Sequence, residues 1–493
     1  MKTEMKQVGD FYELEVGDDL TNSKNYNEDL APTKVKERTW SQFHIAALWV
    51  GMAICVPTYT LGGILTAYFG LSVTEALVTI LLANIVVLIP LTLNAYPGTK
   101  YGIPFPVLLR SSFGSIGSNI PALIRGFVAC GWFGIQTLFG GLAVHLLFSA
   151  ILPFWADLGS QGEVYGFFIF LAMNLAIVIK GSDSIKLLET LSAPILVAVM
   201  IGLLMWSSDK VSFVELLSTP ANRPAEDGFM KYFLSGLTAM VGFWATLSLN
   251  IPDFSRFAKS QKDQVVGQII GLPLTMFLFA SLGVIMTAAS QSMFGETISD
   301  PISLIGKIDS TFWVVIAMLL IIIATLSTNT AANVVSPTND FQNVAPKYID
   351  RTKGVLLTGL VGILLMGWEL LKKMGWVESD FSIEAMLANW LLGYSSLLGP
   401  IAGIMIVDYF LIKKQELDII SLYKEDAIPA FNWAGMIAFL VPVALTIIAL
   451  TFDVLMWFYD YGWFTGAFAG AIIYYLIAKY QEQPAMSAGL EQA

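Results

Sequence analysis

The segment Ile321–Asp340, IIIATLSTNTAANVVSPTND, begins as an apolar run and then becomes rich in small and polar residues. It carries no charge before Asp340. Polar side chains within a membrane-buried run are costly unless they meet a partner, so they mark a pathway or a site. The residues concerned are Ser327, Thr328, Asn329, Thr330, Asn333 and Ser336.

Three residues of this segment share one helix face. Ala324, Ser327 and Thr328 follow one another at i, i+3 and i+4. Carbonyl and hydroxyl oxygens are the ligands that a hard cation such as sodium prefers. Small residues also allow two helices to approach closely. Taken alone, the pattern therefore indicates either a cation site or a helix-packing seam.

The composition defines the class of protein. The chain has 493 residues, of which 56% are hydrophobic and 13% charged, and its mean hydropathy is +0.68. A water-soluble core could not bury so much apolar side chain, so we predict an all-α integral membrane protein. The net charge of −11 argues against nucleic acid as a partner. Two cysteines in apolar segments suggest neither a disulfide framework nor a metal site.

About twelve hydrophobic segments are long enough to span a bilayer. They lie near residues 43–68, 72–96, 120–148, 163–181, 190–207, 231–254, 267–290, 311–336, 354–371, 384–412, 432–451 and 458–479. Of the 27 Lys and Arg residues, 20 fall in the tails and loops on the side of the N-terminus and six in the opposite loops. This asymmetry predicts a multi-pass protein of the plasma membrane with both termini in the cytoplasm.

Two of these segments are interrupted. The first contains Pro57 among several glycines in GMAICVPTYTLGG (51–63), and proline removes a helix hydrogen bond. The sixth repeats the pattern, with Gly236, Gly242 and Pro252. Two broken spans five apart favour two inverted repeats of five spans, with the broken helices lining a midplane site. A simple proline kink in each span is the alternative.

This organisation divides the chain into five parts. They are a cytoplasmic N-terminal tail (1–40), a first repeat (41–208), a second repeat (229–412), two peripheral spans (430–480) and a cytoplasmic C-terminal tail (481–493).

The third span adds an aromatic and an amide side chain. In CGWFGIQTLFGG (130–141), Trp132 and Gln136 lie one turn apart on one helix face. Tryptophan offers a flat surface for stacking a planar ring, and glutamine can pair with the alternating N–H and C=O edge of an amide ring. Trp244 in the sixth span could form a second wall. Most tryptophans in membrane helices, however, serve packing or the interface.

From Asn27 to Lys479 the chain resembles the nucleobase–cation symporter-1 family, in particular its bacterial allantoin and hydantoin permeases. The resemblance rests on NEDLAPT (27–33), ERTW (37–40), TKYGIPFPVLLRSSFG (99–114), NIPALIRG (119–126), WFGIQT (132–137), NIPDFSRF (250–257), STNTAANVVSP (327–337) and LGPIAGIMIVDYF (398–410). It implies a LeuT-type fold and a secondary transporter, not an enzyme.

The resemblance also implies roles for individual residues. Trp132, Gln136, Trp244 and Asn333 match the positions that bind substrate in the family's hydantoin transporter. On an ideal helix Asn333 lies about half a turn around from Ala324, so ion and substrate would use different faces of this span, unless the helix is irregular after Thr330.

For the coupling ion, the resemblance implies sodium. The matching positions are Gly51, Ile54, Ala324, Ser327 and Thr328, of which the first three would contribute backbone oxygens and the last two hydroxyls. Retention of both hydroxyl residues favours sodium over a proton, which is the alternative.

Two residues depart from the family pattern. Cys55 stands where hydantoin and allantoin carriers have Gln or Asn, and a thiol is a weak hydrogen-bonding group. Phe243 stands where the hydantoin transporter has Gly, which should reshape the pocket beside Trp244. Both residues are therefore expected to face the substrate, and a smaller ring or one with an apolar edge is favoured.

We therefore expect a monomeric symporter that carries a small planar N-heterocycle across the lipid bilayer with sodium, by alternating access. The sequence leaves the heterocycle open, from allantoin and hydantoins to nucleobases and pyridoxine-like rings. A proton-coupled permease and an uncoupled channel or binding protein remain as alternatives. Charged residues near the inner ends of spans are expected to form gating or interface ion pairs at the cytoplasmic surface, with a proton relay as the alternative. They are Asp253, Arg256 and Asp408.

Overall fold

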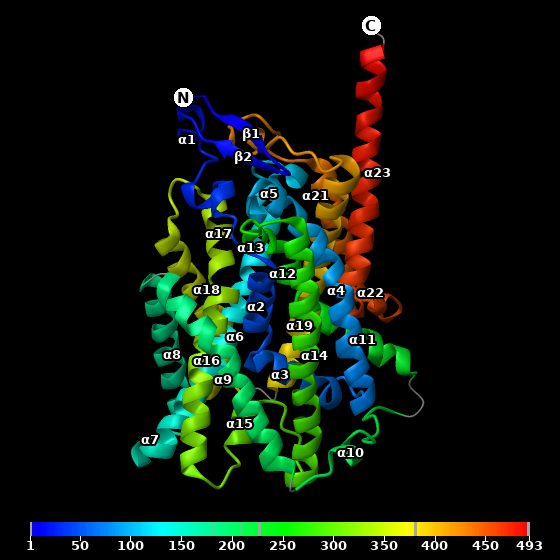
Figure 1. The fold of residues 1–493 in the computed structure, drawn as a ribbon. Helices are drawn as coiled ribbons and strands as arrows, with labels where there is room; N and C mark the ends of the chain where they lie inside the picture. Colours follow the sequence, from blue (N-terminus) through cyan, green and yellow to red (C-terminus); the bar gives the residue numbers. More distant parts are fainter. Residues whose placement is uncertain (1, 181, 209, 225–227, 379–381, 491–493) are drawn as a thin grey trace.

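The computed structural model describes residues 2–180, 182–208, 210–224, 228–378 and 382–490. Within these ranges the fold is helical apart from an N-terminal hairpin of β1 (Glu4–Val8) and β2 (Phe11–Glu15), paired antiparallel. The helices form an elongated bundle, and the hairpin lies at the same end of it as the last turns of the C-terminal helix α23 (Figure 1). Both tails therefore lie on one side of the bundle, as an even number of spans requires.

Twelve spans can be followed in the described ranges. Seven helices, among them the continuous stretch Thr311–Val344, are long and apolar enough to cross a membrane alone. The bent pairs that begin at Gln42 and at Asp453 each form one more span, and three shorter apolar helices complete the set. In chain order the spans are α2 (Gln42–Ala53) with α3 (Val56–Ala67), α4 (Val73–Tyr101), α6 (Asn119–Ile151), α8 (Ser160–Lys180), α9 (Ser182–Ser208), α11 (Phe229–Phe243) with α12 (Ala245–Asn250), α14 (Gln261–Phe294), α16 (Thr311–Asn333) with α17 (Val335–Val344), α18 (Arg351–Lys373), α19 (Ile383–Val407), α21 (Trp433–Ala449) and α23 (Gly462–Leu490).

Shorter helices connect the spans. They are α1 (Asp18–Thr21), α5 (Phe105–Phe113), α7 (Pro153–Ala156), α10 (Phe213–Leu216), α13 (Pro252–Ser255), α15 (Pro301–Ile305), α20 (Ile419–Tyr423) and α22 (Met456–Asp460). Helix α23 extends to Leu490, so the last span continues as a helix into the segment that the sequence analysis assigned to the C-terminal tail.

The first span is broken rather than kinked. Ile54 and Cys55 leave the helical conformation, and α2 and α3 meet at an angle of 61°. Pro57 lies in the first turn of α3, where its missing N–H breaks no helical hydrogen bond. The predicted interruption is confirmed, and the alternative of a simple proline kink is wrong for this span.

The sixth and eighth spans are also interrupted. Helix α11 ends at Phe243 and α12 begins at Ala245, so Trp244 itself is the break (φ −97°, ψ 4°). The break therefore lies eight residues before Pro252, inside the glycine-containing part of the span. In the eighth span α16 continues regularly through Asn333, and the irregular residue is Val334. Ala324 and Asn333 thus lie on different faces of one regular helix.

Glycines allow α3 and α14 to pack backbone against backbone. A Cβ atom on Gly62 would lie 2.0 Å from the carbonyl oxygen of Ala280, and one on Gly283 would lie 1.9 Å from that of Tyr59. Each contact is possible only without a side chain. This pairing holds the second half of the broken first span in place.

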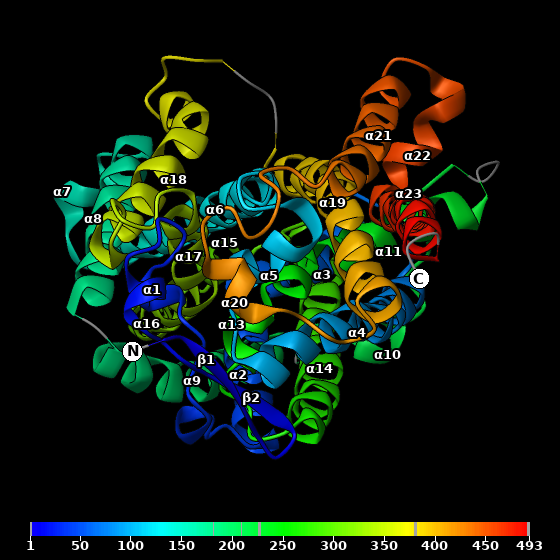
Figure 2. The same ribbon diagram turned by 90° about the horizontal axis from the view of Figure 1, so that it is seen from above.

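The last two spans lie at the periphery. Helices α21 and α23 pack against α19 on one side of the bundle (Figure 2). A Cβ atom on Gly399 or Gly403 would clash with the backbone of α23 at Trp463 or Ala467. The first ten spans therefore form the body of the protein, to which α19 attaches the final pair.

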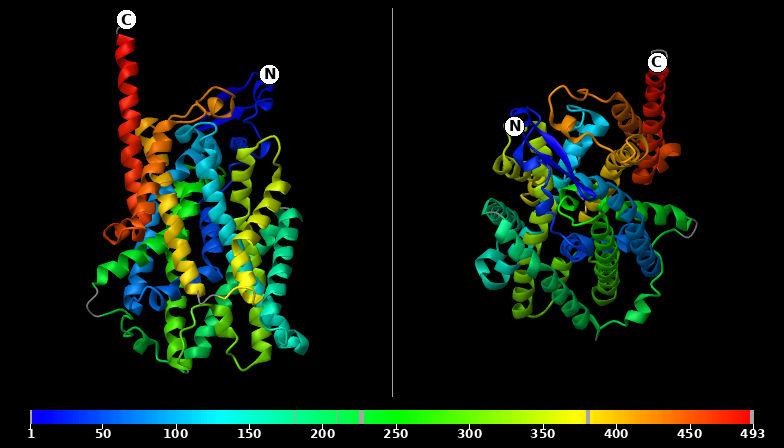
Figure 3. Two further views of the ribbon diagram at one scale, coloured as in Figure 1. Left: turned by 180° about the vertical axis from the view of Figure 1, so that it is seen from behind. Right: turned by 45° about the horizontal axis from the view of Figure 1, so that its top comes forward.

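The end of the bundle that carries the tails is covered by ordered segments. The hairpin and α20 lie across it (Figure 3). Arg38 donates hydrogen bonds to the carbonyl oxygens of Thr33, Thr99 and Tyr12, and the Arg110 side chain donates to that of Leu422. These bonds tie the N-terminal segment, α4, α5 and α20 together at this end of the protein.

Candidate functional site

A seam of polar side chains runs between α6 and α16. Thr328 Oγ1 lies 3.2 Å from Gln136 Oε1 and 3.1 Å from the carbonyl oxygen of Ala324. Both side chains are at least 95% buried, and buried polar groups need such partners. The contact joins a residue predicted to bind the ion to a residue predicted to bind the substrate, so the two predicted sites are adjacent.

Asn333 is connected to the same seam through Asn329, a residue for which the sequence predicted no individual role. Asn333 Nδ2 donates to Asn329 Oδ1 at 3.0 Å. Asn329 Nδ2 lies 3.2 Å from the carbonyl oxygen of Phe133 and 3.3 Å from Thr137 Oγ1. The Asn329 amide thus bridges α6 to Asn333. Its signal in the sequence is its position one turn before Asn333 in STNTAAN, on the same helix face.

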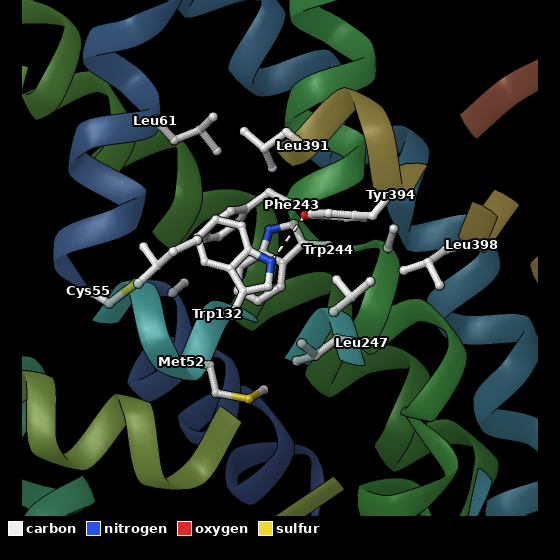
Figure 4. Packing of buried hydrophobic residues seen from close by; sticks show 14 of the residues in the cluster. Met52, Cys55, Leu61, Trp132, Phe243, Trp244, Leu247, Leu391, Tyr394 and Leu398 are labelled. Carbon is white, nitrogen blue, oxygen red and sulfur yellow. Dashed lines mark hydrogen bonds between the residues drawn. The ribbon is translucent and has the colours of Figure 1, made fainter. Parts of the chain in front are cut away.

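An aromatic cluster lies beside the seam. The rings of Trp132 and Phe243 meet edge to face with centroids 5.1 Å apart, and those of Phe243 and Trp244 with centroids 4.9 Å apart. Figure 4 shows these three rings together at the centre of the buried cluster. Phe243 contacts both tryptophans, so the structure brings the three predicted aromatic residues together and gives Phe243 a central position among them.

The indole N–H groups of the two tryptophans point to partners within the protein. Trp132 Nε1 lies 3.2 Å from the hydroxyl of Tyr394 on α19, and Trp244 Nε1 lies 3.2 Å from Oδ1 of Asn84 on α4. The ring of Trp49 packs against Trp244 at 5.1 Å. The N–H groups of both tryptophans are therefore engaged within the protein, and a ligand would interact with the rings themselves.

Cys55 lies at the break of the first span, where its backbone is extended. Its Sγ is 3.2 Å from Thr58 Oγ1, and it belongs to the same buried cluster as Trp132 and Phe243 (Figure 4). A thiol that already contacts a hydroxyl has little hydrogen-bonding capacity left. This arrangement is consistent with an apolar environment at that edge of the cluster.

The residues predicted to bind sodium come from two packed helices. Helix α16 contacts α2, and Ile54 lies in the break that follows α2. Ser327 Oγ is buried and has no hydrogen-bond partner among the described residues. An unpartnered buried hydroxyl is costly, and a hard cation would give it a partner. The hydroxyls of Ser327 and Thr328 and the carbonyl oxygen of Ala324 are therefore a donor set whose chemistry fits sodium.

The expected ion pairs at the inner ends of the spans are not formed within the described part of the chain. Asp253 Oδ1 instead accepts the backbone N–H of Phe105 at 2.9 Å, and Asp408 accepts from the hydroxyls of Ser111 and Tyr474, each at 2.7 Å. The guanidinium of Arg256 lies 5.0 Å from the centre of the Phe257 ring. Hydrogen bonds, not ion pairs, satisfy these carboxylates because hydroxyl and amide donors surround them.

One buried ion pair was missed. Arg125 on α6 and Asp340 on α17 lie 3.2 Å apart, and both side chains are completely buried. The sequence signal was present: Arg125 is a charged residue close to the start of an apolar span, and Asp340 ends the polar segment of the eighth span. The sequence did not indicate that Arg125 and Asp340 pair with each other.

The sequence profile of one protein family, described as permeases for cytosine and purines, uracil, thiamine and allantoin, matches residues 32–480. The chain belongs to this family. It is the nucleobase–cation symporter-1 family, so the resemblance found in the sequence motifs is confirmed.

Individual relatives agree with this assignment. The allantoin permease of Bacillus subtilis is 36% identical over 467 residues, which cover 92% of this chain and 93% of the relative. The purine-uracil permease of Arabidopsis thaliana is 44% identical over 404 residues, 80% of this chain and 66% of the plant protein. The relatives are permeases, so the chain is a transporter and not an enzyme.

A solved structure establishes the architecture. Mhp1, a transporter of this family seen in a closed conformation with bromovinylhydantoin bound, superposes with a TM-score of 0.73 at 25% identity, covering 92% of this chain and 95% of Mhp1. The predicted all-α membrane fold of LeuT type is thereby confirmed. In the present chain, the residues of the polar seam and of the aromatic cluster come from the third, sixth, eighth and tenth spans.

Proposed function

We propose that this nucleobase–cation symporter-1 family member imports a planar N-heterocycle together with sodium by alternating access. The observation that carries the proposal is the contact between Thr328 and Gln136 beside the unpartnered hydroxyl of Ser327. This contact supports the proposal because hydroxyl oxygens that could bind a cation lie next to an amide that could bind a ring. Binding of the ion would then alter the position of the substrate-binding amide, and the coupling would be reciprocal.

Substrate recognition divides between stacking and hydrogen bonding. Trp132 and Trp244 supply aromatic surface, while Gln136 and Asn333 supply donors and acceptors for the N–H and C=O groups of the ring. Phe243 packs between the tryptophans, and Cys55 offers little polar interaction. A compact ring without a large substituent, of the allantoin, hydantoin or nucleobase class, fits this combination.

We further propose that the protein acts as a monomer in the plasma membrane with both tails in the cytoplasm. The excess of Lys and Arg on the side of the tails supports this orientation. In that orientation the end that the hairpin and α20 cover faces the cytoplasm, and the substrate would enter from the opposite side.

The test is uptake into proteoliposomes. Purified protein would first be screened by thermal shift against allantoin, hydantoins, purines and pyrimidines with and without sodium, because a ligand that binds the folded state raises its apparent stability. The best ligand would then be followed as radiolabel with an inward sodium gradient. Accumulation above the outside concentration is expected with sodium, and its absence would leave an uncoupled channel or binding protein.

Variants separate sodium from proton coupling. Ser327→Ala and Thr328→Val together remove both hydroxyls and should abolish the sodium dependence of uptake and of the thermal shift. Thr325→Val is the matched control, because its hydroxyl lies on the same helix, is buried and also lacks a partner among the described residues. Undiminished uptake by the double variant, driven by a pH gradient alone, would establish the proton-coupled alternative instead.

A further inference from the structure

One tyrosine on α19 connects three spans at the candidate site. The Tyr394 hydroxyl accepts a hydrogen bond from Trp132 Nε1 at 3.2 Å and donates one to the carbonyl oxygen of Gly242 at 2.9 Å. The side chain is 3% exposed. Both hydrogen-bonding roles of a single hydroxyl are therefore used inside the protein, between α6, α11 and α19. Figure 4 shows the contact between Tyr394 and Trp132.

The carbonyl oxygen of Gly242 lies in the last turn of α11, where the backbone N–H of Trp244 also points to it. Helix α11 ends at Phe243 because Trp244 breaks the sixth span. The last carbonyl oxygens of a helix lack the N–H groups that the next turn would have supplied. Tyr394 adds a side-chain donor to one of them, so it links α19 to the end of α11 next to the break.

Tyr394 cannot easily shift away from this position. Its ring packs against that of Trp390 with centroids 5.5 Å apart, and Trp390 in turn lies over Gly131, where a Cβ atom would come within 2.2 Å of the indole. Ser395 lies over Gly242, where a Cβ atom would come within 2.1 Å of its hydroxyl. The tenth span is therefore in close contact with both α6 and α11 on either side of Tyr394.

We propose that Tyr394 is a positioning residue that sets the orientation of the Trp132 ring for stacking on the substrate, and that it ties this orientation to the end of α11 and to the tenth span. The inference rests on the proposed function for its effect on transport. Tyr394 itself would not contact the substrate. It acts by accepting the indole N–H, which leaves the face of the ring as the surface offered to the ligand.

Removal of the hydroxyl tests the inference. Tyr394→Phe keeps the ring but leaves the indole N–H of Trp132 and the carbonyl oxygen of Gly242 without this partner. We expect the KM for the heterocycle to rise about tenfold, with a smaller change in maximal rate, because a buried group left unpaired weakens the arrangement that depends on it. Tyr59→Phe is the matched control, since the Tyr59 hydroxyl is buried without a partner among the described residues. Its KM should be that of the wild type.

A double-mutant cycle isolates the route through Trp132. Trp132→Phe retains an aromatic ring but has no N–H to donate. Against that background, adding Tyr394→Phe should change KM far less than it does in the wild type. An equal effect in both backgrounds, or a wild-type KM for Tyr394→Phe, would overturn the positioning role.

A spectroscopic measurement keeps the test independent of transport. The ultraviolet resonance Raman band that reports on hydrogen bonding of indole N–H groups should show the loss of one bonded indole in Tyr394→Phe. The same difference should vanish in the Trp132→Phe background. If the wild type binds no heterocycle, the proposed function fails while the Raman difference still decides the Tyr394 contact. An unchanged Raman band would refute the contact itself.

Discussion

Arg125 Nη1 lies 3.2 Å from Asp340 Oδ2 in a completely buried ion pair that joins the third span to α17, the second half of the eighth. Other atoms of the pair, Arg125 Nε, Arg125 Nη2 and Asp340 Oδ1, have no partner among the described residues. Gly126 makes room for the carboxylate, since a Cβ atom there would lie 3.3 Å from Asp340. Attraction between the charges therefore has to offset the loss of water around both of them.

Breaking this pair on one side should be strongly destabilising. We expect Arg125→Leu to lower the free energy of unfolding by about 3–5 kcal/mol, because it leaves an uncompensated buried carboxylate. The combined Arg125→Leu and Asp340→Leu variant should recover part of that loss. Thermal unfolding in detergent measures both.

A surface pair provides the control for this comparison. Lys353 and Asp350 lie 3.4 Å apart with both side chains 61% exposed. Lys353→Met should leave the melting temperature unchanged, since solvent screens exposed pairs.

The buried pair has its own contradicting outcome. If the variant with both Arg125→Leu and Asp340→Leu is no more stable than Arg125→Leu alone, lost packing and not the unpaired charge causes the destabilisation.

Phe243 should limit the size of the substrate. Its ring contacts both Trp132 and Trp244, so Phe243→Gly would open space between them. We expect this variant to bind hydantoins with bulky substituents at least about tenfold more tightly, while losing about 3–5 kcal/mol of folding stability with the deleted ring. Equilibrium binding measures the first effect and thermal unfolding the second.

Two further variants provide comparisons for Phe243→Gly. Trp132→Ala should abolish both ligand-induced quenching of tryptophan fluorescence and uptake, because it removes the stacking surface. Phe229→Ala, at the start of α11 and 38% exposed, should leave substrate selectivity as in the wild type. Binding of bulky ligands by the wild type as tight as by Phe243→Gly would show that Phe243 does not define the pocket.

Glycine contacts between α3 and α14 predict a stability difference between two similar substitutions. In Gly283→Ala the new methyl group would meet the backbone carbonyl of Tyr59 at 1.9 Å, so the helices must separate, at a cost of about 1–3 kcal/mol. In Gly202→Ala it would meet nothing within 4 Å. That variant should be neutral or more stable by up to about 1 kcal/mol through helix propensity. Equal melting temperatures would contradict the close packing of α3 on α14.

Sodium dependence should survive substitution at Gly51. The predicted ligand there is the backbone carbonyl oxygen, which alanine retains, and a Cβ atom on Gly51 would have no neighbour within 4 Å. Gly51→Ala should therefore show the sodium activation constant of the wild type within about twofold, a change of under 0.5 kcal/mol. Ser327→Ala, which deletes a ligand oxygen, should raise that constant at least about tenfold, or 1.4 kcal/mol. The opposite ranking would move the cation away from this pair of helices.

Local features of the sequence were sufficient to predict the membrane spans and the breaks within them. Long apolar runs must form helices in a bilayer because no water is present to bind their backbone groups. The loss of a backbone N–H at Pro57 and the glycines of the sixth span also act within a few residues. The membrane fold, the breaks at Ile54–Cys55 and near Trp244, and the polar character of Ser327 to Asn333 could therefore be inferred from residues close together in the chain.

Only the tertiary structure decided which polar groups are partners. Trp132 and Tyr394 are 262 residues apart in the chain, and Arg125 and Asp340 are 215 apart. The polar residues of the segment Ile321–Asp340 indicated a binding site. Its contacts with Gln136, Phe133 and Arg125, however, depend on how α6 lies against α16 and α17. Hydrogen bonds and ion pairs act over about 3 Å, so their partners follow from the packing of whole helices, which no local pattern of residues specifies.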